Sequence, residues 1–179
     1  VIGDSGYASP AFIWRSGKMT GLGSLGAGGT EANAISDRGW VVGKSLTKDD
    51  LYHAFLWRNG RMIDLGTLGG KNSRAEAISD LGVVVGASES RRFWARAFLW
   101  QNGRMLELGA LPSHPYSEAI AINERDEVLG LSETANSDVR SFLWRDGEMT
   151  DLGTLGGCCT TATALNERGQ VVGESETKG

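Results

Sequence analysis

Proline, cysteine and histidine are scarce in this sequence of 179 residues, which holds 3 Pro, 2 Cys and 2 His. The two cysteines, Cys158 and Cys159, are adjacent, so they cannot join distant segments. Without His or further Cys nearby they make no structural zinc site. We expect them simply to fill a loop; a strained bond between the two neighbouring cysteines is the alternative. No apolar run reaches the roughly 18–20 residues of a membrane span. Disulfides, zinc and membrane helices therefore do not organise this fold.

Strong charge of either sign is also absent, since 22 acidic residues face 18 basic ones for a net charge of −4. No block of Lys and Arg stands out, which disfavours nucleic acid and anionic membranes as partners. The sequence begins at Val1, within a repeat and without a secretory segment. We therefore expect a piece processed or excised from a longer protein.

What the sequence does contain is one motif written four times, at 11–14, 54–57, 97–100 and 141–144. Its Phe recurs at steps of 43, 43 and 44 residues, from Phe12 to Phe55, Phe98 and Phe142. A period of this length is typical of a supersecondary unit that buries its apolar face by stacking on a copy of itself. We predict one repeat domain over 1–179, with repeats at about 11–53, 54–96, 97–140 and 141–179. Residues 1–10 form a partial repeat that could close a ring.

Each repeat reads as four short strands, and the second copy gives the pattern at 54–57, 62–65, 74–79 and 84–86. Asn59-Gly60 between the first two strands predicts a type I′ turn. Gly86 at a fixed place in the fourth strand predicts a bulge or a close backbone approach. No segment of ten or more residues shows a clean helical period.

Two further repeated features are explained by folding. The Gly-rich segment 66–70 has no Lys-Ser/Thr of a phosphate-binding loop, so we expect a turn whose Leu68 packs into the core. The Trp that ends the first strand recurs in every repeat, and we expect it to pack between neighbouring sheets rather than to line a ligand channel. Its four copies are Trp14, Trp57, Trp100 and Trp144.

Four strands per repeat of this length predict an all-β fold, a β-propeller built from four-stranded blades. We expect four blades; the alternative is a fragment of a larger propeller or repeat array. The fourth strand occurs five times, because 1–5 repeats the pattern of 171–175. The surplus copy could fray, extend a sheet edge, or pair with another molecule and form an oligomer.

The stretch 53–57, followed by 60–70 and then by Ala77-Ile78-Ser79-Asp80, resembles the HAF repeat, a family of probable extracellular bacterial repeat proteins. The resemblance covers nearly the whole chain. The name-giving His53 is replaced by Pro10, Arg96 and Arg140 in the other copies. The resemblance implies a secreted or cell-surface protein and carries no catalytic residue.

Candidate ligand-binding residues lie where the repeats differ, in the connection before each first strand and in the insertion 111–116. Exposed aromatic rings beside polar groups could stack on a sugar and hydrogen-bond its hydroxyls. Drift in loops whose aromatics merely cover a blade edge is the structural alternative. The candidates are Tyr52, His53, Phe93, Trp94, Arg96, His114 and Tyr116.

No catalytic or metal-binding motif is present. Asp64, Glu107 and Asp151 recur in the second strand and could hold a Ca²⁺ ion near the axis, although we favour solvated or hydrogen-bonded carboxylates. The sequence therefore favours a non-catalytic extracellular binding or scaffold module for a glycan or protein. One alternative is a hydrolase or lyase at the mouth of the propeller, around His114. Another is a passive structural array.

Overall fold

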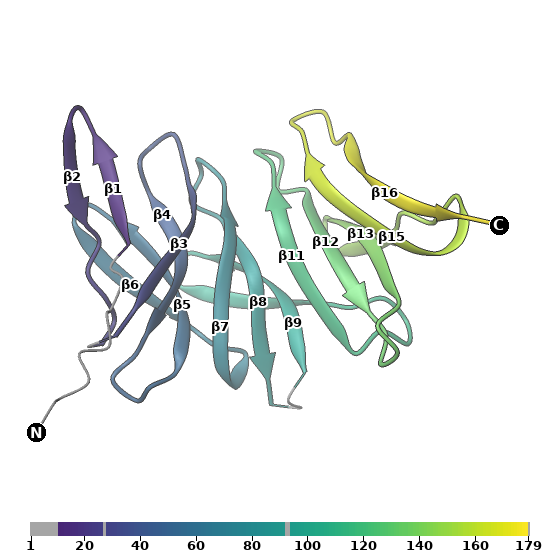
Figure 1. The fold of residues 1–179 in the computed structure, drawn as a ribbon, viewed down its shortest axis with the longest axis horizontal. Coiled ribbons are helices and arrows are strands. Elements are labelled where there is room, and N and C mark those ends of the chain that lie inside the picture. The colour runs from purple at the N-terminus through teal and green to yellow at the C-terminus, as the bar shows by residue number, and fades with distance from the viewer. Residues whose placement is uncertain (1–10, 27, 92–93, 179) are drawn as a thin grey trace, which may run out of the picture.

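The computed structural model describes residues 11–26, 28–91 and 94–178, which form antiparallel β-sheets joined by short connections (Figure 1). The strands are β1 (Phe12–Arg15), β2 (Lys18–Gly21), β3 (Thr30–Ile35), β4 (Val41–Leu46), β5 (Tyr52–Arg58), β6 (Arg61–Gly66), β7 (Gly69–Ile78), β8 (Val84–Ser90), β9 (Ala95–Gln101), β10 (Arg104–Gly109), β11 (Tyr116–Ile122), β12 (Val128–Glu133), β13 (Val139–Arg145), β14 (Glu148–Asp151), β15 (Gly156–Leu165) and β16 (Val171–Thr177). The all-β prediction is confirmed. A search of the described residues finds no helix with the length and hydrophobicity to cross a bilayer.

Three sheets have four strands, and each is a blade. The first blade is β3–β6, the second is β7–β10 and the third is β11–β14. Two strands pair at either end of the row, and we call β1-β2 the N-terminal half-blade and β15-β16 the C-terminal half-blade. The prediction of four-stranded sheets is confirmed for the three blades.

The blades are out of phase with the sequence repeats. Repeat 54–96 supplies β5 and β6 to the first blade, and β7 and β8 to the second. Each repeat therefore ends one sheet and starts the next, so neighbouring blades are linked through the chain as well as by packing.

The predicted type I′ turns are present in the hairpins β1-β2, β5-β6, β9-β10 and β13-β14, which join the first strand of each repeat to its second. Asn59 and Gly60 have φ of 52° and 76°, both positive as this turn requires. The other three turns are Ser16-Gly17, Asn102-Gly103 and Asp146-Gly147, again with positive φ at both positions. Between β11 and β12, Asp126 adopts a φ of 58° where the other repeats have Gly.

Gly86 is required by a bulge in the neighbouring strand. The register of β7 against β8 shifts between Ala75 and Ala77, and a Cβ on Gly86 would lie 2.1 Å from the carbonyl oxygen of Arg74. A Cβ on the equivalent glycines in β4, β12 and β16 would likewise clash with the carbonyl oxygen of Glu31, Glu118 or Thr161. The predicted bulge with close backbone approach is confirmed.

Hydroxyl groups fasten each blade to the one before it. Ser73 Oγ in β7 accepts the N–H of Ala54 in the first blade at 2.9 Å and donates to the carbonyl of Gly66 at 2.6 Å. Ser117 makes the same two bonds one blade later. The N–H of Leu68 donates to Ser88 Oγ at 2.9 Å, and its side chain packs on the core, as predicted.

The hydrophobic core lies between blades. One cluster combines Val42 and Leu56 of the first blade with Phe98 and Trp100 of the second. Trp100 is only 8% exposed, and Trp57 and Trp144 are partly buried against the other core clusters, which supports the predicted packing role for these three copies. Trp14, in the N-terminal half-blade, is 63% exposed and does not fit it. The blades thus bury one another, as expected of units that cannot bury their own faces.

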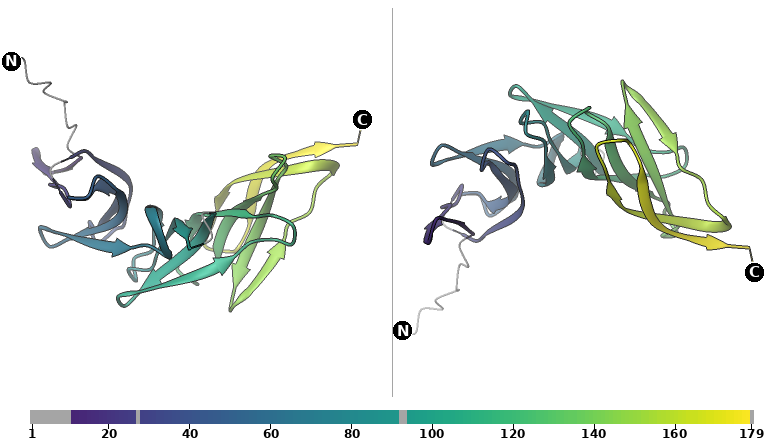
Figure 2. Two further views of the ribbon diagram at one scale, coloured as in Figure 1. Left: turned by 90° about the horizontal axis from the view of Figure 1, so that it is seen from below. Right: turned by 90° about the horizontal axis from the view of Figure 1, so that it is seen from above.

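The described residues form an open row and not a ring. A ring of four blades would require β16 to pair with β1, but the two half-blades lie at opposite ends of the row (Figures 1 and 2). The number of blades therefore stays a prediction. Residues 1–10, the predicted partial repeat, lie outside the described residues.

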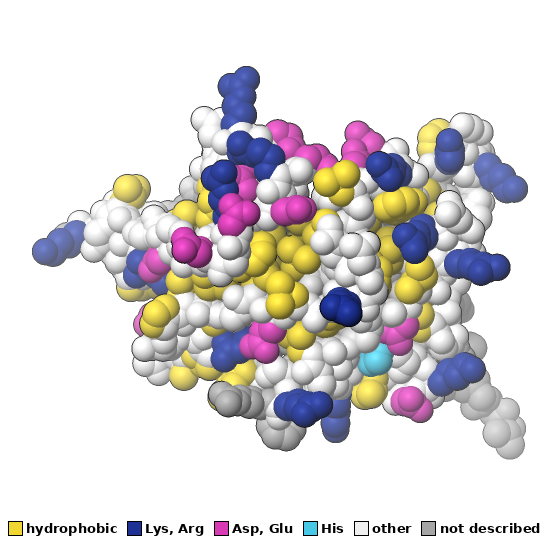
Figure 3. All heavy atoms as spheres, turned by 180° about the vertical axis from the view of Figure 1, so that it is seen from behind, with side chains coloured by type: hydrophobic (Ala, Val, Ile, Leu, Met, Phe, Trp, Pro, Cys, Tyr) yellow, Lys and Arg dark blue, Asp and Glu magenta, His cyan; other side chains and the backbone are white. Residues whose placement is uncertain are grey.

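The surface of the row mixes side-chain types. Seen from behind, hydrophobic side chains gather across the middle, while Lys and Arg lie mostly towards the margins (Figure 3). Acidic side chains are interspersed among the basic ones. This face therefore carries no extended field of one sign.

Candidate functional site

One end of the row collects the connections that vary most between repeats. In antiparallel sheets, successive connections alternate between the two ends. The β4–β5, β8–β9 and β12–β13 connections therefore share an end with the segments that lead from one blade to the next. We call this end, along the lower edge of Figure 1, the loop face. Six of the predicted site residues lie there, namely Tyr52, His53, Trp94, Arg96, His114 and Tyr116. Phe93 lies outside the described residues.

A groove of about 250 Å³ opens between the first and second blades, and Tyr52 lines it. Lys44 Nζ lies 5.3 Å from the centroid of the Tyr52 ring, within cation–π range. Asn72 accepts the N–H of Tyr52 at 3.1 Å and donates to Glu89 at 2.9 Å. This hydrogen bond from Asn72, against the effect of burial, lowers the pKa of Glu89. The groove thus has an aromatic wall and fixed polar groups of both signs.

A second groove, of about 200 Å³, opens between the second and third blades, and Tyr116 lines it. The rings of Trp94 and Tyr116 meet edge to face, with centroids 4.6 Å apart and planes at 87°. Trp94 remains 38% exposed. Both grooves share Arg74, Ala87 and Ala95, so they are adjacent along the loop face.

Arg74 divides the two grooves and holds two carboxylates. Its Nε donates to Glu76 at 2.7 Å, and its Nη2 lies 2.5 Å from an oxygen of Glu118 on β11. Burial alone would lower the pKa of Arg74, but the hydrogen bond and charge of Glu118, with those of Glu76, raise it. Burial and the charge of Glu118 raise the pKa of Glu76.

Sequence reasoning missed Arg74 and Glu118. The same repeat position holds Glu31, Arg74, Glu118 and Thr161. A change of charge at one repeat position within a strand was the signal that could have identified them.

The recurring carboxylates do not converge on an axis. Asp64 accepts from His53 Nδ1 at 2.9 Å, and Asp151 pairs with Arg140 at 2.9 Å. Arg96 and Glu107 form the matching pair at 3.5 Å in the second blade. These acids lie on β6, β10 and β14, at the sheet edges away from β3, β7 and β11, which contact one another.

Each of these acids therefore binds the basic residue of its own hairpin. Among the described residues they do not form a cation site together. The favoured expectation, carboxylates held by hydrogen bonds, fits this geometry better than a shared Ca²⁺ ion. The first repeat, which has Gly21 in place of the acid, has Pro10 in place of the base.

His114 sits beside Arg96 in the insertion of the third repeat. Arg96 Nη1 donates to the carbonyl of His114 at 3.2 Å, and a shallow hollow of about 410 Å³ lies against both residues and Glu107. His114 Nδ1 is 2.7 Å from the carbonyl of Pro112, whereas its buried Nε2 has no hydrogen-bond partner. Within the described chain, no carboxylate hydrogen-bonds this ring.

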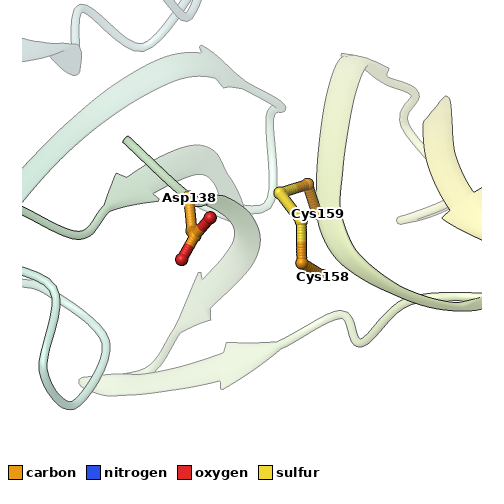
Figure 4. Close-up of side chains that lie close together, drawn as sticks. All are labelled: Asp138, Cys158 and Cys159. Carbon is orange, nitrogen blue, oxygen red and sulfur yellow. A yellow bond between two sulfur atoms is a disulfide. The ribbon is translucent and has the colours of Figure 1, made fainter. Parts of the chain in front are cut away.

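The adjacent cysteines lie in a strand, which corrects the expectation of a loop. Cys158 and Cys159 belong to β15, because that strand starts early, at Gly156, and they are bonded to each other (Figure 4). Asp138 of the third blade is close to both sulfurs. With the sulfurs joined, this group offers no thiolate to a metal ion.

No family model and no curated protein matches this chain. Among solved structures it is similar to the β-propeller domain of the trilobed protease from Pyrococcus furiosus, which has an open velcro topology. The TM-score is 0.51 at 15% sequence identity. The chain has a β-propeller fold. The match covers 79% of this chain and 44% of the protease chain, and at this identity it shows the fold alone. The resemblance to HAF repeats stays a prediction.

Proposed function

We propose that this protein is a non-catalytic binding module at the cell surface or outside the cell, and that its loop face holds a glycan. The observation that carries the proposal is that Tyr52 and Tyr116 line two adjacent grooves, with the exposed Trp94 packed edge to face on Tyr116. Aromatic faces pack on the apolar face of a sugar ring, and fixed polar groups such as Asn72 and Glu118 bind its hydroxyls. Grooves this small and open suit single sugar units.

Alanine substitution of the aromatic pair tests the proposal. A panel of glycans is first screened against the chain, and the affinity of each hit is measured by calorimetry. Trp94→Ala and Tyr116→Ala should each weaken binding about 10- to 100-fold, as for aromatic hot spots. Leu106→Ala is the matched control, since Leu106 is an exposed apolar residue (53%) on β10 of the same blade as Trp94. Binding that survives both aromatic substitutions would contradict the proposal.

A protein partner on the same face is the second form of this hypothesis. It is favoured if the glycan panel is blank and a protein ligand is lost in the same two variants. The hydrolase or lyase alternative requires an acid–base group for His114, whose ring hydrogen-bonds only a backbone carbonyl among the described residues. The passive array requires no ligand at all.

The finer prediction of a four-bladed ring concerns closure and not the loop face. It requires the C-terminal half-blade to meet the N-terminal half-blade of the same chain. The larger array remains the alternative. The grooves lie between complete blades, so the proposed binding site is the same in either case.

A further inference from the structure

The two half-blades are complementary halves of one blade. In every complete blade, the strand equivalent to β16 pairs with the strand equivalent to β1, and these pairs are β4-β5, β8-β9 and β12-β13. Their register is the same each time, with Val41 opposite Trp57, Val84 opposite Trp100 and Val128 opposite Trp144. Among the described strands, β16 and β1 each lack this neighbour.

Side chains that are buried in complete blades are exposed at these two edges. Phe12 is 53% exposed, while its three equivalents on β5, β9 and β13 are fully buried. Val172 is 62% exposed, while its equivalents on β4, β8 and β12 are fully buried. Leu155 is 73% exposed, against 6% for Leu111 in the third blade. The apolar surface left open at one edge is the surface that the other edge covers elsewhere.

A series of hydrogen bonds between blades also stops at these ends. The N–H of Asp37 donates to Asp80, that of Asp80 to Glu124, and that of Glu124 to Glu167, at 2.7, 2.7 and 3.1 Å. Within the described residues, the series continues neither past the N–H of Glu167 nor before the exposed carboxylate of Asp37. Joining the two half-blades would bring this donor and this acceptor to adjacent blades.

We propose that the C-terminal half-blade of one molecule pairs with the N-terminal half-blade of a second copy, head to tail. The register of the complete blades then places Val171 opposite Trp14, Val172 opposite Ile13 and Gly173 opposite Phe12. The resulting blade has the strand order β15-β16-β1-β2, and the N–H of Glu167 donates to Asp37 of the second copy. The pairing does not depend on the proposed function.

A second copy fits better than the chain's own N-terminal half-blade. The half-blades lie at opposite ends of the row, so closure within one chain would change the angle at every blade interface (Figure 2). Pairing with a second copy changes none. If both joint blades form, two copies have eight blades in a closed ring, which is within the four to eight blades of propellers.

Residues 1–5 are an alternative partner for β1, because they repeat the sequence pattern of 171–175. They lie outside the described residues. They could supply only one strand to β1. They would leave β16 without a partner and the hydrogen-bond series without its continuation. In the complete blades, Val85 and Leu111, which are equivalent to Val172 and Leu155, are buried in a cluster with Ala97 and Phe142 from strands of the β1 type.

Sedimentation equilibrium of the 179-residue chain tests the association. The proposal predicts a mass that rises with concentration to twice the 19.1 kDa of the chain. Val172→Glu and Trp14→Glu should each weaken association about 100-fold or more, since each buries an unpaired charge in the joint blade. Leu81→Glu is the matched control, because Leu81 is similarly exposed (58%) but lies in a turn of the second blade.

Mixing the two variants shows which edges meet. One intact interface remains between a Trp14→Glu chain and a Val172→Glu chain, so the mixture should recover pairs that neither variant forms alone. Recovery supports head-to-tail pairing. The proposal would be overturned if the chain is a monomer at every concentration, or if association persists in Val172→Glu.

A disulfide cross-link distinguishes pairing with a second copy from closure within one chain. Cysteines introduced together as Ile13→Cys and Val172→Cys should give oxidised dimers on a non-reducing gel. A cross-linked single chain would overturn the proposal in favour of the four-bladed ring. Association lost in Ile2→Glu but kept in Val172→Glu would also overturn it, in favour of residues 1–5.

Discussion

Complete blades and half-blades share one sequence pattern and differ in what covers them. Phe98 in β9 is fully buried between the first and second blades, whereas Phe12 in β1, in the same motif, is about half exposed. Both hairpins have the same type I′ turn and the same strand pairing. The local motif therefore specifies the hairpin, and the neighbouring strand and blade determine how much apolar surface is buried.

The largest loss of stability is expected when the Phe of the repeated motif is replaced in a complete blade. Phe98→Ala should lower the free energy of unfolding by about 3–5 kcal/mol, since it leaves a cavity in a packed core. Phe12→Ala should cost less than about 1 kcal/mol in dilute solution, where no second copy covers it. Denaturant unfolding of both variants measures the difference. Equal losses would show that the half-blade is packed like a complete one.

A buried carboxylate gives the next largest effect. Glu127 in the third blade is 2% exposed and accepts from Asn123 at 2.6 Å and Arg125 at 2.7 Å, with Arg145 at 3.2 Å. Glu127→Gln should lower the unfolding free energy by about 2 kcal/mol, as expected for hydrogen bonds to a charged group. Gln170→Ala, at the equivalent and exposed position of the C-terminal half-blade, should cost less than about 0.5 kcal/mol.

Glu127 should also make the stability of the fold depend on pH. The hydrogen bond from Asn123 outweighs burial and, with the charges of Arg125 and Arg145, lowers the pKa of Glu127 below its usual 4.5. A lowered pKa stabilises the fold at pH values above 4.5, and this contribution is lost as the pH falls through the folded-state pKa. Stability of the native chain should therefore fall more steeply below pH 4.5 than that of Glu127→Gln. Parallel curves would contradict this account.

The smallest effect is expected in the hydrogen-bond series along the turns. Asp80 accepts from the N–H of Asp37, so Asp80→Ala should cost about 1 kcal/mol. Asp37→Ala should cost almost nothing in dilute solution, because no described N–H donates to its carboxylate. At concentrations where two copies pair, Asp37→Ala should weaken the association. Thermal unfolding at two concentrations checks both statements.

Much of the fold could be predicted because it depends on local residues. Asn59-Gly60 specifies its turn, and Gly86 marks the bulge opposite Arg74, since both requirements act within one hairpin. The phase of the sheets could not be predicted, because a repeat of four strands looks the same wherever the sheet boundary falls. The angle between blades, and with it the ring, depends on packing that no single repeat contains.

The candidate site could be predicted where it depends on strand order, and not where it depends on contacts between repeats. The aromatic residues of variable connections lie on one face, because antiparallel order places those connections together. Arg74 was missed, since its role depends on Glu118 one repeat later. The expectation of a loop at Cys158 is wrong because β15 begins at Gly156, five residues before the alternating pattern of the strand at 161–166 indicates.

Hydrogen exchange of β1 and β16 at two concentrations tests most directly the claim that half-blades differ from blades only in lacking their partner. The account predicts that the amides on the open edges of β1 and β16, which point away from β2 and β15, exchange fast in dilute solution and become protected together at high concentration, while those of β8 and β9 stay protected throughout. Protection of β1 and β16 that is the same at both concentrations would contradict it.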